Sequence, residues 1–403
     1  GARMALSPEP KRAAAAVVDG RAGELVALSH RIHANPEIRF EEERAAAWCA
    51  EALAAAGIAV EAGVCDLPTA FVATAGSGPL TIAICAEYDA VPGIGHACGH
   101  NVIAASAVGA GMALAPLADD LGVTVEVVGT PAEEGGGGKI LMLERGGFAG
   151  VDAAMMVHPS PTEMDRMPCL AVAHVDVHYT GKAAHAAAYP ELGINAADAL
   201  TVAQTAIGLL RQHISPAARI HGIVTHGGDA PNVVPAHASG KWYIREQTVA
   251  ELAELLPRVE RCFEAGALAT GCEMRIEPQS PIYSEMRDDA EMRALYRRNA
   301  EALGRAFVAP DDEASARMSG STDMANVSLA LPTIHPMLGL GCFPVSNHQP
   351  EFAAFCATPT ADRAMRDGAV AMAWTCIDMA TTPSVRDRLL APDPHPPASA
   401  GGR

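Results

Sequence analysis

Two pairs of residues that can bind metal or move protons each follow an apolar segment of the sequence. Cys98 and His100 lie two positions apart in a glycine-containing loop, and a thiolate and an imidazole at this spacing can bind one metal ion. Glu133 and Glu134 precede four consecutive glycines, so one carboxylate can bind metal while the other serves as a general base. The alternatives are a pair packed in a loop without function and a solvated turn.

Histidines and carboxylate-binding residues occur further along the chain. His158 ends an apolar segment and could equally be a hydrogen-bonded core histidine, whereas His348 lies in a polar segment and is ambiguous by itself. His185 and Asn232 lie in loops rich in small residues or in Gly and Pro, and Arg245 closes an apolar segment. Arg and Asn side chains can hold a carboxylate by hydrogen bonds. Turn formation or a surface ion pair would explain the same residues.

Other classes of site are absent from the sequence. It contains neither an HExxH helix motif nor a GxSxG nucleophile motif. The segment Gly138-Lys139-Ile140 fails as a phosphate-binding loop, because the Ser/Thr is missing and no glycine stands five positions before Gly138. The polar loop 319–323 could likewise bind a substrate or simply form a turn.

The amino-acid composition limits the possible binding partners and the cellular compartment. The 29 basic and 47 acidic residues give a net charge of −18 without a basic cluster, which argues against nucleic-acid or membrane-surface binding. Apolar runs are broken well short of about 18 residues, so we expect no membrane span. The ten cysteines are scattered, several within apolar runs, which favours a reducing, cytoplasmic setting.

The elements that must position these residues form two patterns. Strands and helices alternate from about residue 69 to 157, which predicts an α/β fold with a mainly parallel sheet sandwiched by helices. Residues 171–283 instead read strand, helix, strand, strand, helix, strand, the ferredoxin-like βαββαβ order. We therefore predict one domain in two parts, 4–170 and 284–391, with a second domain, 171–283, inserted between them and a disordered tail at 392–403.

Taken together, the motifs resemble those of the dinuclear-metal aminoacylase and carboxypeptidase amidohydrolases, peptidase family M20. The motifs are most similar to those of the branch that contains aminoacylase-1-like protein 2 and the aminobenzoyl-glutamate hydrolase subunits. The resemblance extends from about residue 33 to residue 348 and is carried by the following segments: Asp89, His96 to His100, Pro131 to Gly138, Val157 to Pro159, Gly181 to His185, Pro231 to Pro235 and Asn347 to Phe352.

The resemblance implies a role for each matched residue. Two divalent ions, zinc or manganese with cobalt or nickel as further alternatives, would be held by Cys98, His100, Glu134, His158 and His348, with the Cys98 thiolate bridging. Asp89 would orient a ligand, and Glu133 would be the general base. His185 would stabilise the oxyanion, from its own subunit or from a partner's, while Asn232 and Arg245 would hold the substrate carboxylate.

The implied function is hydrolysis of the amide bond in a small N-acyl amino acid or dipeptide-like substrate with a free carboxylate. Glu87 stands where carboxypeptidase-like members have a histidine ligand, Cys98 where they have a bridging aspartate, and Asn101 where the hippurate-hydrolase branch has Asp. The resemblance further implies that the divided domain is catalytic and that the inserted domain is a lid or dimerisation domain, through which we expect a homodimer. The alternative is a non-catalytic, metal-stabilised subunit that binds a ligand or forms part of a hydrolase.

Overall fold

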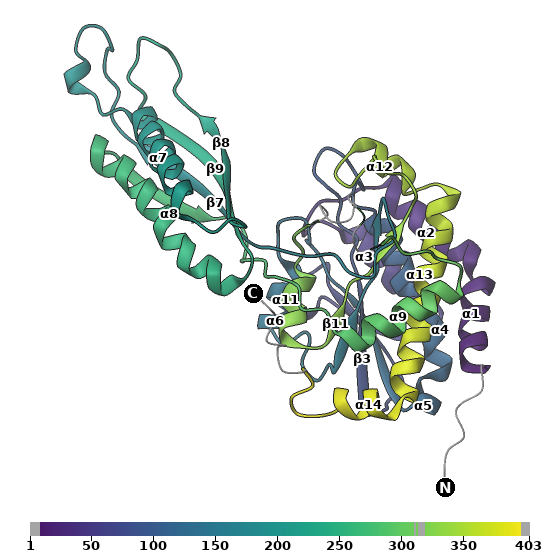
Figure 1. The fold of residues 1–403 in the computed structure, drawn as a ribbon. Coiled ribbons are helices and arrows are strands. Elements are labelled where there is room, and N and C mark those ends of the chain that lie inside the picture. The colour runs from purple at the N-terminus through teal and green to yellow at the C-terminus, as the bar shows by residue number, and fades with distance from the viewer. Residues whose placement is uncertain (1–8, 310–311, 313–318, 396–403) are drawn as a thin grey trace. The chain divides into compact units, whose positions relative to one another are not determined.

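The computed structural model describes residues 9–309, 312 and 319–395, so residues 4–8 of the first predicted domain and 396–403 of the predicted tail lie outside the described ranges. The chain divides into two compact units (Figure 1). Unit 1 comprises residues 1–168 and 286–403, and unit 2 comprises residues 169–285. The unit boundaries thus fall within about two residues of the predicted limits of the insertion.

Unit 1 is built on a six-stranded sheet of order β1-β2-β4-β3-β5-β11. The strands β4, β3, β5 and β11 run parallel, whereas β1 and β2 pair antiparallel at one edge. The mainly parallel sheet is therefore confirmed. The bounds are β1 Ala59–Ala62, β2 Phe71–Ala75, β3 Leu80–Ala86, β4 Val123–Gly129, β5 Ala153–Met155 and β11 Thr333–Ile334. A two-stranded parallel sheet joins β6, His158–Ser160, to β12, Met337–Gly339.

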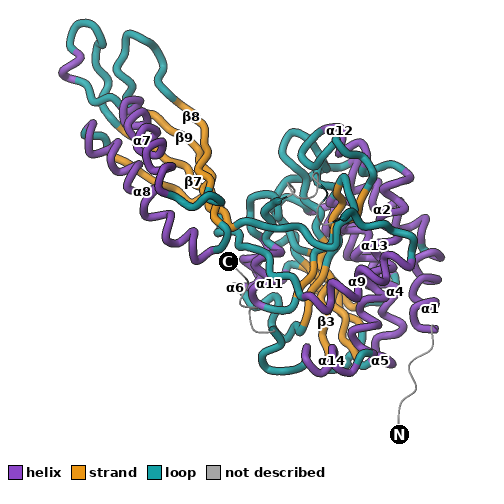
Figure 2. The backbone as a smooth tube through the Cα atoms, in the orientation of Figure 1, coloured by secondary structure: helices purple, strands orange, loops and turns teal. Residues whose placement is uncertain are grey.

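Alternation along β3 shows why helices cover both faces of this sheet (Figure 2). Ile82 and Ile84 face one hydrophobic cluster, and Ala83 and Cys85 face another, as the two-residue period of a strand requires. The helices of unit 1 are α1 Glu9–Gly20, α2 Ala22–Ala34, α3 Glu43–Ala55, α4 His100–Leu114, α5 Ala118–Leu121, α6 Gly138–Glu144, α9 Ala290–Ala302, α11 Met324–Ala330, α12 Pro350–Phe355, α13 Pro359–Thr381 and α14 Pro383–Leu389.

Several elements differ from the predicted ones. The predicted alternation extends to about residue 157, but strand β5 ends at Met155 and the chain enters a second sheet as β6. The edge strand β1 and the short strands β11 and β12 carry no strong periodic signal, so local patterns do not predict them. Two- and three-residue strands buried on both faces are too short for a pattern to appear. Helix α1 is amphipathic, with Ala14 and Val18 buried, but lies before the predicted elements.

Helix α4 and the short helix after it form the most apolar segment of the described chain. The 22 residues His100–Leu121 are long and apolar enough to cross a membrane, contrary to the expectation that every apolar run is too short. However, 83% of this segment's apolar window is buried inside the protein, and every residue of α4 is buried. A helix that is apolar on all sides is expected at the centre of a large core, so this segment is interpreted as a core helix.

Unit 2 has the predicted βαββαβ order. Its antiparallel sheet has the strand order β10-β7-β9-β8, the arrangement of a ferredoxin-like fold. Two long helices pack on one another and on this sheet around a separate core that includes Trp242 and Phe263. The bounds are β7 Ala171–Thr180, α7 Ala196–Leu210, β8 Arg219–His226, β9 His237–Glu246, α8 Val249–Thr270 and β10 Glu273–Pro278.

Candidate metal centre

The candidate site lies where the four parallel strands of unit 1 end. Carboxyl ends of parallel strands meet at one edge of a sheet, which is where α/β proteins bind ligands. Each of the four strands is followed within a few residues by a polar side chain that can bind a metal ion or transfer a proton. These are Glu87 and Asp89 after β3, Glu133 and Glu134 after β4, His158 after β5, and His335 after β11.

The loop that carries Cys98 enters helix α4 through a tightly packed glycine. Gly99 has φ of 69°, and a Cβ atom there would meet Pro159 Cγ at 2.7 Å and Cys356 Sγ at 2.9 Å. Only glycine fits this position without strain. The backbone N–H of His348 donates to the carbonyl of Ala97 at 2.9 Å, so the late polar segment is fixed beside the same loop.

Two groups of possible metal ligands share the Cys98 thiol. One consists of Cys98, His100 and His158, and the other of Cys98, Glu134 and His348; within each group the ligand atoms lie within 4.8 Å of one another. The structure thus brings together all five residues proposed as ligands. A single sulfur common to two donor groups is the arrangement that a bridging ligand between two metal ions requires.

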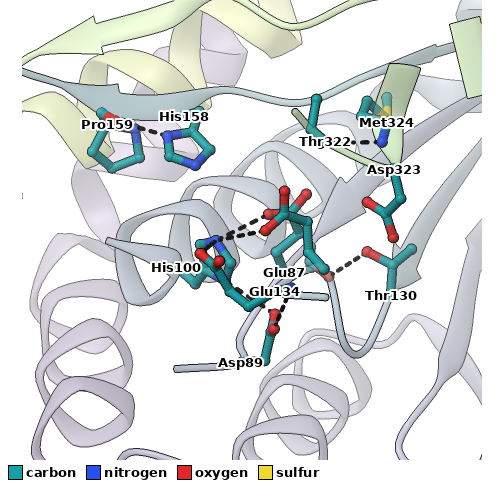
Figure 3. Close-up of polar contacts among 12 residues, drawn as sticks. Glu87, Asp89, His100, Thr130, Glu134, His158, Pro159, Thr322, Asp323 and Met324 are labelled. Atoms are coloured by element: carbon teal, nitrogen blue, oxygen red, sulfur yellow. Dashed lines mark hydrogen bonds and ion pairs between the residues drawn. The ribbon is translucent and has the colours of Figure 1, made fainter. Parts of the chain in front are cut away.

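Asp89 fixes the orientation of His100. Its Oδ1 lies 3.0 Å from His100 Nδ1, and its Oδ2 accepts a hydrogen bond from the Glu134 N–H at 2.9 Å. Figure 3 shows the His100 ring between Asp89 on one side and the carboxylates of Glu87 and Glu134 on the other. With Nδ1 engaged by the carboxylate, Nε2 is the nitrogen that remains for a metal, the usual division of the two ring nitrogens at metal sites.

Polar atoms without hydrogen-bond partners show that this donor set fits a divalent cation. Within the described part of the chain, Glu87 Oε2, His100 Nε2 and Glu134 Oε1 are buried and lack a hydrogen-bond partner. Glu134 Oε1 lies 3.7 Å from His100 Nε2 and 3.6 Å from His348 Nε2. Buried polar atoms are normally hydrogen-bonded. Sulfur, imidazole and carboxylate donors that converge in this way have the chemistry of a metal centre.

The two adjacent glutamates have opposite electrostatic environments. Burial and the neighbouring Glu134 carboxylate raise the pKa of Glu133 well above its usual range. Burial would also raise the pKa of Glu134, but His348 and the charge of His100 outweigh it and lower that pKa to about 2. Burial raises the pKa of the Cys98 thiol as well. Metal binding therefore has to displace protons from this site.

A buried ion-pair cluster lies directly beside the proposed ligands. Lys139 Nζ donates to Glu87 Oε1 at 2.6 Å and to Asp323 Oδ1 at 3.0 Å, and the Lys139 N–H donates to Asp323 Oδ2 at 2.9 Å. All three side chains are fully buried. The second carboxylate oxygen of Glu87 lies 3.3 Å from His100 Nε2, so the cluster connects helix α6 and the loop before α11 to the metal-ligand set.

A cavity of about 280 Å³ opens onto these side chains. The proposed ligands Cys98, Glu134, His158 and His348 line it together with Glu133. The rest of its wall consists of Met167, Ser319, Gly320, Ser321, Thr322, His335, Met337, Ser346 and Asn347. The cavity is therefore large enough for a small polar substrate beside the carboxylate proposed as the base.

Three predicted residues belong to unit 2 instead. His185 and Asn232 lie in neighbouring loops, since the Ala186 N–H donates to the Asn232 carbonyl at 3.0 Å. His185 is exposed, and its Nδ1 accepts hydrogen bonds from two following backbone N–H groups. Arg245 lies on β9, and its Nε donates to His221 at 3.2 Å. Their action on a substrate held by unit 1 remains a prediction.

Sequence reasoning misses some residues of the site. In the sequence, Lys139 belongs only to a failed phosphate-loop pattern, Asp323 is one member of a polar loop, and His335 belongs to no motif. The detectable signal for His335 is its place directly after the short segment Pro332-Thr333-Ile334, which, like the segment before His158, contains a parallel strand that ends at the site. Recognising it requires knowing that Thr333–Ile334 is a parallel strand.

A comparison with protein families shows to which family the chain belongs. Residues 83–363 match the model of peptidase family M20/M25/M40. The chain belongs to this family. Its matched region runs from inside β3 into α13 and so contains the whole candidate metal centre except the supporting N-terminal helices.

Curated relatives and solved structures agree with this assignment. Xaa-Arg dipeptidase of Mus musculus is 39% identical over 93% of this chain and 90% of its own length. One of the p-aminobenzoyl-glutamate hydrolase subunits of Escherichia coli K12 is 37% identical over 60% of this chain and 55% of its own length. The fold resembles an aminobenzoyl-glutamate utilization protein from Klebsiella pneumoniae (TM-score 0.71, 19% identity, 90% of this chain and 97% of that chain).

A dinuclear metal binding peptidase of the M20 family from Bacillus subtilis has the same fold, with a TM-score of 0.61 and 21% identity over 88% of this chain and 99% of that chain. Family membership and the relatives together make this chain a metal-dependent amidohydrolase of the M20 class. The family likeness and the candidate ligand groups are consistent with dinuclear metal binding.

Proposed function

We propose that the protein hydrolyses the amide bond of a small dipeptide or N-acyl amino acid that carries a free carboxylate. The observation that supports this most strongly is the pair of ligand groups sharing Cys98, with the Glu133 carboxylate in the wall of the same cavity. A purely structural zinc site is closed by four ligands and needs no additional carboxylate beside one of them.

The proposed metal ligands are Cys98, His100, Glu134, His158 and His348, and zinc or manganese is the proposed metal. Bound divalent ions would lower the pKa of a water and polarise the scissile carbonyl. Glu133 would accept a proton from the attacking water and deliver it to the leaving amine. Burial and the neighbouring carboxylates, Glu134 first, raise its pKa, and the positive charge of bound ions would oppose this shift.

Residues of the inserted unit would complete the reaction. His185 would stabilise the developing oxyanion, a contribution of about 2.7–4 kcal/mol per donor in comparable sites. Asn232 and Arg245 would hold the substrate carboxylate by amide and guanidinium hydrogen bonds. The exposed His185 imidazole is free of ion pairs among the described residues, so it is accessible to a substrate or to another copy of the chain. A homodimer through this unit and a cytoplasmic location both remain predictions.

Dipeptides with a C-terminal arginine are the first substrates to test. The Mus musculus relative, which matches 93% of this chain, is named Xaa-Arg dipeptidase, whereas the match to the aminobenzoyl-glutamate hydrolase subunit covers 60%. A panel should therefore contain Ala-Arg, Ala-Lys, N-acetyl-arginine and aminobenzoyl-glutamate. The enzyme would be assayed for amine release with each candidate metal and with a chelator.

Glu133→Gln tests the mechanism. The substitution keeps the size of the side chain but removes the base, so we expect bound metal to be retained and kcat to fall by at least about 100-fold. Metal content measured by elemental analysis, alongside amine release, separates loss of the base from loss of the metal. A fully active Glu133→Gln variant would contradict the role of Glu133.

A second candidate function is that of a metal-stabilised partner chain in a larger hydrolase. It is favoured by the likeness to a protein named as one of several hydrolase subunits. This interpretation predicts that metal-loaded protein releases amine from no compound of the panel until a partner chain is added. Activity of the purified chain alone would exclude it.

A further inference from the structure

His335 is a buried histidine in the wall of the cavity whose side chain has no hydrogen-bond partner on another residue. Its exposed fraction is 1%, and neither Nδ1 nor Nε2 has a hydrogen-bond partner within the described chain. His96 is also buried with both ring nitrogens unpartnered, but it does not line the cavity. Burial alone therefore does not indicate a binding role. His335 differs from His96 because it is buried, unpartnered and also in the cavity wall.

The position of His335 is fixed by backbone pairing on both sides. The Met156 N–H donates to the Ile334 carbonyl at 3.3 Å, and the His158 N–H donates to the Pro336 carbonyl at 3.0 Å. The ring centroid lies 5.4 Å from that of His158, with 36° between the ring planes. His335 is thus held beside a proposed metal ligand by the rigid edge of the sheet, which is the support a binding residue needs.

The geometry does not make His335 a metal ligand. Among the described residues, none of the groups of three ligand atoms within 4.8 Å contains it. An imidazole has two ring nitrogens that can donate or accept hydrogen bonds. In the cavity wall, an imidazole that is not a metal ligand can therefore form hydrogen bonds with a bound ligand.

We propose that His335 is a substrate-binding residue that forms a hydrogen bond with a polar group of the substrate at the metal centre. This inference rests on the proposed function. A buried imidazole without a partner costs free energy, and an apolar residue of similar size would fill the same space without that cost. The cost is recovered when a substrate in the cavity supplies the missing partner, such as an amide or amino group next to the scissile bond.

The test compares two substitutions at this position. His335→Phe keeps the ring and removes both nitrogens, whereas His335→Gln keeps a donor and an acceptor. Each would be combined with Glu133→Gln, so that the best substrate of the panel binds without being hydrolysed, and its Kd would be measured by calorimetry on metal-loaded protein. We expect His335→Phe to raise Kd about tenfold and His335→Gln to raise it less than about threefold, as for loss and retention of one hydrogen bond.

Metal content and the same kinetic variants with Glu133 intact complete the test. Metal content should equal that of the parent protein in both His335 variants, and kcat/KM should follow the order of the Kd values. The inference is overturned if His335→Phe leaves Kd unchanged, if Gln and Phe have equal effects, or if metal is lost in proportion to binding. Failure of the parent enzyme to hydrolyse any panel compound would instead refute the proposed function.

Discussion

Two buried charge clusters of unit 1 differ in whether their polar atoms are paired. Arg305 donates to both oxygens of Glu163, at 2.8 and 2.7 Å, to Asp367 at 3.0 Å and to the Gly339 carbonyl at 2.7 Å. The Gly339 N–H also donates to Glu163 at 2.7 Å. In this cluster every carboxylate oxygen of Glu163 has a donor, and the guanidinium joins β12 to α13 and to the segment after α9.

In the cluster at the strand ends, by contrast, some polar atoms have no hydrogen-bond partner among the described residues. Lys139 pairs with Glu87 and Asp323, yet Glu87 Oε2, His100 Nε2 and Glu134 Oε1 stay without hydrogen-bond partners within the described residues. Both clusters are buried and acidic. The two clusters therefore differ in hydrogen-bond pairing more than in burial or charge, and only the unpaired atoms have capacity for a ligand.

The largest effect should follow removal of the thiol that both ligand groups share. Cys98→Ala removes one donor from each group, so we expect loss of both metal ions and a fall in activity of more than about 100-fold, beyond the 10–100-fold cost of losing an outer partner. His348→Ala is the matched comparison, because it removes a donor from one group only. Its metal content should fall from two ions per chain to one.

Elemental analysis of both variants after dialysis against a weak chelator measures this difference. Equal metal content in Cys98→Ala and the parent chain would show that the thiol does not bridge. His348 is 60% exposed, so its removal should lower the unfolding midpoint of the metal-free chain less than loss of a fully buried ion-pair partner such as Lys139 does.

The next largest effect concerns the cations of the two clusters. Lys139→Met leaves Asp323 buried without its ion-pair partner and leaves Glu87 with only His100, at 3.3 Å, opposite it, so we expect the free energy of unfolding to fall by about 3–5 kcal/mol. Arg305→Met should cost a similar amount, about 3 kcal/mol, since its side chain is only 11% exposed. Urea unfolding of the metal-free chains measures both.

Activity then separates the two variants. Lys139 holds Glu87 against His100, so folded Lys139→Met should bind metal more weakly and turn over more slowly. Folded Arg305→Met should keep the metal affinity and kcat of the parent, because its partners are not proposed ligands. If both variants lose metal equally, the distinction between a structural and a binding cluster is wrong.

The sequence predicts the fold and most proposed ligands but not the ion pairs of the two clusters, for a physical reason. The strand and helix periods of β3, β4 and the unit 2 elements extend over several residues, so local patterns predict the fold and most of the proposed ligands. Lys139 to Asp323 and Arg305 to Glu163 are pairs separated by 184 and 142 positions. Such pairing depends on tertiary contacts that leave no local period, and the two-residue strand that positions His335 is equally invisible.

Glu42 provides the smallest and finest test, because it is a buried carboxylate that has hydrogen bonds but no cation among its described partners. Its Oε2 accepts from the Ala132 N–H at 2.7 Å, and its Oε1 accepts from the Thr69 hydroxyl at 3.2 Å. Burial, followed by the charge of Asp89, raises its pKa to about 8. A folded-state pKa above the unfolded value means that the folded chain binds more protons, so stability should fall as pH rises from about 4.5 to about 8.

Glu42→Gln can keep both hydrogen bonds and cannot ionise. We therefore expect it to be more stable than the parent chain by about 1–3 kcal/mol at pH 7, with a flatter dependence of stability on pH between 5 and 8. Urea unfolding of metal-free protein across this range measures the slopes. Identical slopes in variant and parent would mean that Glu42 stays ionised when buried, and that hydrogen bonds alone satisfy a carboxylate as completely as Arg305 satisfies Glu163.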